Sequence, residues 1–99
     1  MITHIVLWKI DKRFTTEEKI NVKLEIKNRL LSLPAVIPCI RHMDVQENDV
    51  AAPDTNFDIC LYSKFDSMVD FFTYRDHPAH SKVGDYVKSV VESRAAIDF

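Results

Sequence analysis

Glycine is nearly absent from this chain, and cysteine is rare. The only glycine is Gly84, so the sequence has no glycine-rich loop that could hold a phosphate, and nucleotide-dependent chemistry is disfavoured. Cys39 and Cys60 stand in different expected strands without CxxC spacing, which indicates neither a zinc site nor a disulfide. No Ser-His-Asp or Cys-His arrangement has a recognisable local context, so the familiar hydrolytic chemistries are disfavoured as well.

The chain also lacks a large excess of positive or negative charge. Thirteen Lys and Arg residues against fifteen Asp and Glu residues give a formal net charge of −2, and the basic residues form no arm or tail. We therefore expect no nucleic-acid partner. No apolar run approaches membrane-spanning length, and the first residues do not follow the pattern of a secretion signal, so we expect no membrane partner and a cytoplasmic location.

What the chain does have is strong hydrophobic patterning. Its 99 residues, 46% of them hydrophobic, are enough for one core, so we expect a single domain over residues 1–99. Residues 2–10 alternate like a strand with two partly apolar faces. One face carries Ile2, His4, Val6, Trp8 and Ile10, and the other carries Thr3, Ile5, Leu7 and Lys9.

A long helix is expected next. Thr15 and Glu18 have the spacing of a capping box, which predicts a helix from about Thr16 to Leu33. Its apolar residues form two stripes at helical spacing, Val22, Ile26, Leu30 and Leu33 in one, and Ile20, Leu24 and Leu31 in the other. Two stripes suggest two packing partners, namely the helix's own sheet and a second helix or subunit.

Prolines and turn-forming residues divide the middle of the chain. Pro34 and Pro38 end the helix, and a second strand is expected at about residues 39–46. Residues 47–56 are rich in Asn, Asp and Pro, which is typical of a long hairpin loop. A third strand is then expected over residues 57–65.

The last third of the chain predicts a broken helix and a strand. Asp66 or Ser67 can cap a helix that breaks near His77-Pro78, because proline restricts the residue before it. The helix should resume over residues 79–93 and be followed by a strand at 94–99.

The order of elements is β-α-β-β-α-β, which predicts a ferredoxin-like α+β domain. In this fold a four-stranded antiparallel sheet has its helices on one face. If the helices cover the side of the first strand with His4, Val6 and Trp8, an apolar surface with Ile5 and Leu7 is left open. Such a surface usually marks a subunit interface, so we expect a homodimer.

The residues best suited to chemistry lie around the helix break, in the run from Tyr74 to His80. An imidazole suits proton transfer near neutral pH, and a phenol can polarise a carbonyl oxygen, so Tyr74 and His80 could form an enolising site. His4 shares the expected helix-covered face and could point into the same space. The alternative is structural: Pro78 starts a helix, His77 lies outside it, and His80 binds only backbone or solvent.

The sequence leaves metal binding open. His77 and His80 would need a third ligand and an uninterrupted helix, so we do not expect them to hold a metal. Carbonyl oxygens near Pro34, Ile37 and Ile40, in the turn after the first helix, could hold a hard cation such as Mg²⁺, but such sites cannot be read from side chains.

Several of these segments, taken together, resemble the stress-responsive A/B barrel (Dabb) domain family. The resemblance spans the chain, and the strongest motif is the His-Pro-x-His segment at residues 77–80. Cys39 is a departure, because the family usually has glycine there. The matching segments are His4-Ile5-Val6-Leu7-Trp8-Lys9, Ile37-Pro38-Cys39-Ile40, Asp58, Phe65-Asp66-Ser67, Tyr74, His77-Pro78-Ala79-His80 and Asp98-Phe99.

The resemblance implies a dimeric α+β barrel with the helices outside, and a site without a cofactor. Olivetolic acid cyclase, a characterised relative, condenses a linear polyketide with a tyrosine and a histidine that match Tyr74 and His80. By analogy, His80 would remove a proton α to a carbonyl, and Tyr74 would stabilise the enolate oxygen. The implied pocket lining is His4, Val6, Trp8, Ile26, Leu30, Leu61, Val83 and Val91. Lys27 and Trp8 disfavour a long alkyl tail in it.

Three functions remain open at this point. The chain could be a homodimer that binds a small organic molecule between sheet and helices, or a cofactor-free cyclase or monooxygenase-like enzyme that uses Tyr74 and His80. It could also be a non-catalytic stress or assembly protein in which these two side chains only join the broken helix to the sheet. A buried Tyr74 hydroxyl beside an open pocket would favour the catalytic function over the structural one.

Overall fold

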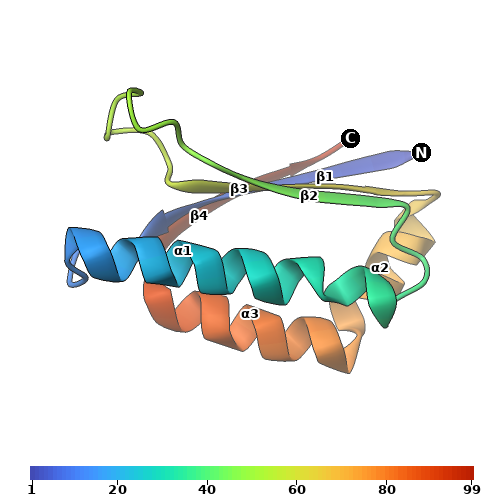
Figure 1. Cartoon of the computed structure of the whole chain (residues 1–99). Helices are drawn as coiled ribbons and strands as arrows, with labels where there is room; N and C mark the ends of the chain where they lie inside the picture. Colours follow the sequence, from blue (N-terminus) through green and yellow to red (C-terminus); the bar gives the residue numbers. More distant parts are fainter.

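The centre of the molecule is a four-stranded antiparallel sheet, seen in a computed structural model that describes residues 1–99. The strands are β1 (Ile2–Ile10), β2 (His42–Glu47), β3 (Ile59–Phe65) and β4 (Val91–Asp98), in the order β2-β3-β1-β4. The two ends of the chain lie side by side, because Thr3 and Phe99 exchange two backbone hydrogen bonds of 2.7 and 3.0 Å (Figure 1). β2 and β4 are the edge strands.

The helices lie on one face of this sheet. They are α1 (Thr16–Leu31), α2 (Met68–Asp76) and α3 (Pro78–Val90), and Figure 1 shows α1 and α3 running side by side beneath the strands. The buried side of β1 faces them, with His4, Val6, Trp8 and Ile10 all at most 6% exposed. This is the ferredoxin-like α+β fold that the order of elements predicted, with its second helix divided into α2 and α3.

The helix starts follow from local sequence. The Thr15 hydroxyl accepts a hydrogen bond from the Glu18 amide at 3.1 Å, and the Glu18 carboxylate accepts one from the Thr15 amide at 2.8 Å, which confirms the capping box. Ser67, rather than Asp66, caps α2 by accepting from the Asp70 amide at 3.2 Å. Both caps satisfy amides that have no partner inside the first helical turn.

The helix ends were predicted less well than the starts. α1 ends at Leu31 instead of Leu33, and a 3₁₀ turn, η1 (Leu33–Ala35), follows because Pro34 cannot continue the α-helical hydrogen bonds. α3 ends at Val90 instead of residue 93. Its last carbonyl accepts from the Asp11 amide at 2.9 Å, and the β-branched Val91 already has extended backbone angles, so β4 begins without a loop.

Two strand starts also differ from the prediction. β2 begins at His42 instead of residue 39, because residues 36–41 continue as a turn in which the Ile40 amide donates to the Ile37 carbonyl at 3.2 Å. β3 begins at Ile59 instead of residue 57, and the Asp58 side chain just before it accepts from the Ile10 amide at the end of β1.

Only one apolar stripe of α1 is covered within the chain. Val22, Ile26, Leu30 and Leu33 are buried against the sheet, whereas Ile20, Leu24 and Leu31 are exposed. α3 packs beside α1 through other side chains, among them Arg29, whose guanidinium lies 4.0 Å from the Tyr86 ring centre. No helix has the length and apolarity needed to cross a bilayer.

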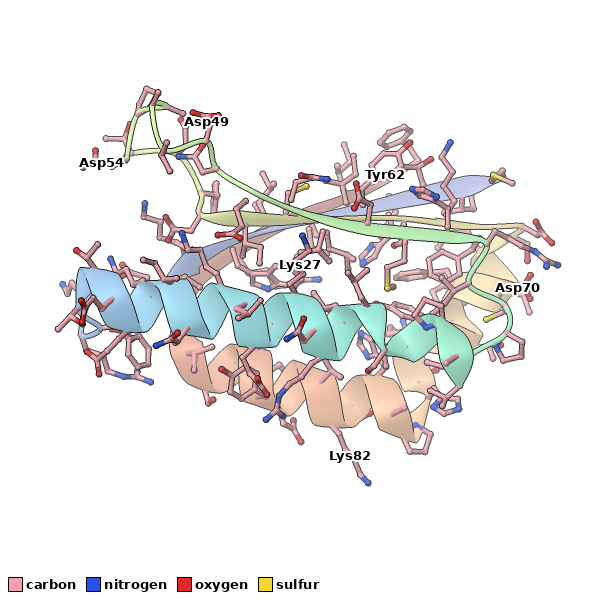
Figure 2. The ribbon with its side chains drawn as sticks, viewed as in Figure 1. Lys27, Asp49, Asp54, Tyr62, Asp70 and Lys82 are labelled. Carbon is pink, nitrogen blue, oxygen red and sulfur yellow. The ribbon has the colours of Figure 1, made fainter.

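The face of the sheet away from the helices carries no cover. Ile5 lies opposite Tyr62 and Ile97 in the strand register, and Leu7 lies opposite Cys60 and Ala95. Figure 2 shows Tyr62 pointing away from the helices. These six residues, Ile5, Leu7, Cys60, Tyr62, Ala95 and Ile97, are called the open face below, and they form the apolar surface that the alternation in β1 predicted.

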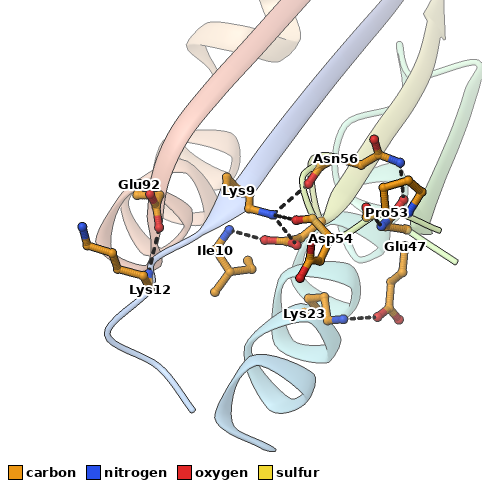
Figure 3. A network of polar contacts seen from close by, with 11 residues as sticks. Lys9, Ile10, Lys12, Lys23, Glu47, Pro53, Asp54, Asn56 and Glu92 are labelled. Carbon is orange, nitrogen blue, oxygen red and sulfur yellow. Dashed lines mark hydrogen bonds and ion pairs between the residues drawn. The ribbon is translucent and has the colours of Figure 1, made fainter. Parts of the chain in front are cut away.

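The long loop between β2 and β3 rises on the side of the open face and is fastened to the end of β1 (Figures 1 and 3). Lys9 Nζ donates to the carbonyls of Asp54 at 2.6 Å and Asn56 at 2.8 Å. The Asp58 carboxylate accepts from the Ile10 amide at 2.7 Å. These bonds give a loop of turn-forming residues a fixed position without a core of its own.

Candidate functional site

The run from Tyr74 to His80 adopts its shape through a shared cap. His77 ends α2, where its amide donates to the Tyr74 carbonyl, and it begins α3, where its ring Nδ1 accepts from the Ala79 amide at 3.0 Å. Pro78 takes the first helical position, where a missing N–H costs nothing. The chain therefore turns sharply between the two helices, and His77 has a structural role.

A pocket of about 490 Å³ opens between the sheet and α3. This is within the usual range for small-ligand sites. Apolar residues of β1, β3, α1 and α3 form its walls, and polar groups of β1, α2, α3 and β4 surround them. Its lining residues include His4, Trp8, Leu30, Leu61, Tyr74, His80, Gly84, Lys88 and Arg94.

Tyr74, one of the lining residues, has an unusual hydroxyl group. Tyr74 is 1% exposed, packed against Phe65 and Phe71, yet its hydroxyl has no hydrogen-bond partner. Burial raises the pKa of this phenol above its ordinary value, so it stays protonated and able to donate. A buried hydroxyl without a partner costs about 1–3 kcal/mol, which a ligand oxygen would offset.

The His80 ring packs against the Tyr74 ring. The two ring centres are 4.5 Å apart, with planes tilted by 59°. Burial lowers the pKa of His80, the charges of His4 and Arg94 act in the same direction, and the Arg75 backbone and Asp76 oppose them. His80 is therefore a neutral imidazole at neutral pH, in the state that can accept a proton.

A second imidazole reaches the pocket from β1. His4 is 5% exposed, and its ring centre lies 6.3 Å from that of Tyr74. Its Nδ1 is hydrogen-bonded to the Asp98 carboxylate on β4. A carboxylate accepts only, so Nδ1 carries a proton and donates it to this hydrogen bond.

Comparison with known families places the chain in a wider group. The sequence profile described as Stress responsive A/B Barrel Domain, or Dabb, matches residues 2–99. The chain belongs to the Dabb family. The resemblance seen in the sequence motifs is thereby confirmed.

Solved structures similar to this Dabb domain share its fold over nearly the whole chain. A dimeric ferredoxin-like protein of unknown function from Bacteroides fragilis is 36% identical, with a TM-score of 0.89 and coverage of 99% of this chain and 93% of that one. A dimeric ferredoxin-like protein from Thermobifida fusca is 24% identical, with a TM-score of 0.83 and coverage of 99% and 88%.

Some of the similar structures carry a named activity. Hydroxynitrile lyase from Passiflora edulis is 16% identical, with a TM-score of 0.79 and coverage of 99% of this chain and 90% of that one. At this identity the likeness shows the common fold alone. No curated protein matches the sequence.

The Dabb pocket brings together most of the side chains that the sequence singled out. Tyr74 and His80 line it, as do His4, Val6, Trp8, Leu30, Leu61 and Val83. Ile26 and Val91 do not. Ile26 is fully buried between α1 and the sheet, and Val91 pairs with Ile10 at an irregularity of the β1–β4 ladder. Lys27 lies near Asp44 of β2 and is also absent from the lining.

Three residues at the pocket were not assigned to the site from the sequence. Asp98 contacts His4 only because β1 and β4 pair, and Arg94 enters the lining by the same pairing, opposite Trp8. Gly84 lines the pocket from the middle of α3, where a glycine is otherwise unfavourable. The periodicity of α3 placed Gly84 on a helix but could not indicate the cavity beside it.

The fold brings together no set of side chains that could bind a metal ion. No group of three or more His, Cys, Asp or Glu side chains is arranged to hold a metal ion. The carbonyl site expected near Pro34, Ile37 and Ile40 stays a prediction, and the Ile37 carbonyl already accepts from the Ile40 amide.

Proposed function

We propose that this Dabb domain binds a small carbonyl compound in the Tyr74–His80 pocket and catalyses enolisation without a cofactor, as in the aldol cyclisation of a linear polyketide. The observation that carries the proposal is the Tyr74 hydroxyl. It is buried, protonated and without a partner, and it belongs to a side chain that lines an open pocket beside a neutral imidazole. Buried hydroxyls with a structural role are usually hydrogen-bonded within the protein.

The proposed reaction needs two groups with different tasks. His80 takes the proton from the carbon α to a ligand carbonyl, and the electrons of that C–H bond become the enolate. Tyr74 donates a hydrogen bond to the developing oxyanion. In a cyclisation the enolate carbon attacks a second carbonyl of the same ligand, and the resulting alkoxide recovers the proton from the His80 imidazolium.

His4 is the second imidazole of the proposed site. With Nδ1 bonded to Asp98, its Nε2 is left to form a hydrogen bond with the ligand or with a water in the pocket. Asp98 does not itself line the pocket, so we assign it a positioning role in which it fixes the tautomer and ring orientation of His4.

The proposal also concerns the assembly of the protein. We propose a cytoplasmic homodimer in which two open faces pack against each other. Support comes from the uncovered apolar strip around Ile5, Leu7 and Tyr62, and from the relatives described as dimeric. Cys39 and Cys60 are free thiols, which fits a reducing compartment.

Screening of linear β-polyketones tests the enzymatic proposal. Cyclised product is measured by liquid chromatography and mass spectrometry, and deuterium uptake at the α carbon is measured by NMR in D₂O. We expect His80→Gln and Tyr74→Phe to lose at least about 100-fold in rate, the combined scale of general-base and oxyanion-donor contributions. His42→Ala is the matched control, because His42 is exposed on β2 and lies outside the pocket.

Two results would separate the alternatives. Equal turnover by the native chain and both pocket variants would contradict catalysis by Tyr74 and His80. Ligand binding that depends on Tyr74, with neither cyclisation nor α-proton exchange for any carbonyl compound, would instead support the small-molecule binding function without chemistry.

A further inference from the structure

The Tyr74–His80 pocket has a cationic side that the proposed proton transfer does not use. Arg94 of β4 and Lys88 of α3 both line the pocket, and neither takes part in an ion pair or a side-chain hydrogen bond. The third lining cation, Arg75, is already paired with the carboxylate of Asp76, at an Nε to Oδ1 distance of 2.8 Å.

The position of Arg94 follows from the strand register. It lies directly opposite Trp8, so its side chain leaves the sheet on the same face as His4, Val6 and Trp8. On this face an alternating strand would ordinarily carry an apolar residue. β4 is an edge strand whose residues beyond Val91 are exposed, so the guanidinium stays at the open side of the pocket.

Arg94 acts on the two reactive groups of the site. Burial dominates the pKa of both Tyr74 and His80, and the charge of Arg94 lowers each of them in addition. The same cation therefore lies within electrostatic reach of the phenol and of the imidazole.

One lining carboxylate opposes this charge. Asp85 of α3 also faces the pocket, and it forms no ion pair with Lys88 or Arg94. The pocket therefore has two unpaired cations, Arg94 and Lys88, and one unpaired carboxylate, Asp85, beside an apolar inner wall. A desolvated carboxylate suits the planar guanidinium of Arg94, which can bind it with two parallel hydrogen bonds.

We propose that the ligand is a keto acid: its carbonyl oxygen meets the Tyr74 hydroxyl, its apolar body fills the pocket, and its carboxylate binds Arg94 with help from Lys88. The inference rests on the proposed function for the carbonyl end only. It narrows the substrate class to carbonyl compounds that carry a carboxylate and excludes neutral ones.

Titration calorimetry with two matched probes tests this inference without any turnover. The probes are para-acetylbenzoate and its methyl ester, which share the ketone and the ring and differ in the charge. The native protein should bind the acid at least about 10-fold more tightly than the ester, because hydrogen bonds to charged groups exceed neutral ones by this order. Added salt should weaken binding of the acid alone.

Substitutions show which residues cause the preference for the acid over the ester. Arg94→Met should weaken binding of the acid by about 10-fold or more and leave binding of the ester within about 2-fold, whereas Arg94→Lys should keep part of the preference. Asp85→Asn should strengthen binding of the acid. Lys88→Met should also weaken binding of the acid, and Lys82→Met is its matched control, because Lys82 is on the same helix and points away from the sheet (Figure 2).

Each outcome decides the inference. The inference is overturned if the native protein binds the acid and the ester with equal affinity, or binds neither of them. It is also overturned if Arg94→Met loses binding of both the acid and the ester. Acid preference that depends on Arg94 but comes with no turnover keeps this inference and rejects the enzymatic proposal. Cyclisation of neutral polyketones with no preference for the acid keeps the enzymatic proposal and rejects this inference.

Discussion

The Nδ1 atom of His4 is hydrogen-bonded to the carboxylate of Asp98, although 94 positions separate the two residues in the chain. The contact exists because β1 and β4 pair antiparallel with His4 directly opposite Asp98. It joins the first strand to the last one at the wall of the pocket, so the folding of the whole chain is needed to form it.

Asp98→Asn should disturb His4 without removing either imidazole. The amide can donate as well as accept, so the Nδ1–H tautomer of His4 is no longer imposed. We expect a rate loss of about 10- to 100-fold, the scale found for partners of this kind, and a change in the ¹⁵N chemical shifts of the His4 ring. Unchanged shifts and rate would show that the carboxylate has no positioning role.

Tyr74→Phe should separate function from stability. It deletes a buried hydroxyl that bonds to nothing and leaves the ring that packs against Phe65 and Phe71. We expect urea denaturation to show a free energy of unfolding that is unchanged or higher by about 1–2 kcal/mol, while activity is lost. Destabilisation by more than about 1 kcal/mol would mean that the hydroxyl has a structural partner after all.

The pH profile should report the neutral state of His80. Its pKa in the folded chain lies below the ordinary value of 6.5, chiefly because of burial, so the unfolded chain binds this proton more tightly. The contribution to stability is therefore complete above pH 6.5 and is lost as the pH falls through the folded value. The acid limb of kcat/KM should likewise lie below 6.5, and His80→Gln should remove the stability change.

Gly84 should control the size of the pocket. It lines the cavity from the interior of α3, and a Cβ atom built on it would meet nothing within 4 Å. Gly84→Ala is expected to raise the free energy of unfolding by about 0.5–1 kcal/mol, as in other helix interiors. Gly84→Leu should instead fill the cavity and abolish binding of para-acetylbenzoate; retained binding would place the ligand elsewhere.

Leu7→Glu should split the proposed dimer. Leu7 lies in the middle of the open face, so a charge there would be buried in an interface between two sheets. Sedimentation should show a monomer, and Ile20→Glu should remain dimeric, since Ile20 belongs to the exposed stripe of α1. A native chain that sediments as a monomer at micromolar concentration would contradict the assembly itself.

Local patterns in the sequence were sufficient for most of the fold. Thr15 and Glu18 marked the start of α1, Pro78 marked the break between α2 and α3, and the alternation of β1 separated the helix-covered face from the open one. These features depend on residues close together in the chain, whose hydrogen bonds and side-chain directions follow from short-range geometry. The Dabb motifs likewise identified the family before any contact was known.

The pocket was decided by the tertiary structure. Tyr74 and His80 were recognisable as a pair, but the isolation of the Tyr74 hydroxyl depends on the packing of three helices and the sheet around it. Arg94 and Asp98 are ordinary charged residues of an exposed strand until pairing with β1 sets them opposite Trp8 and His4. Strand register is a long-range property, because it places side chains from opposite ends of the chain on one face.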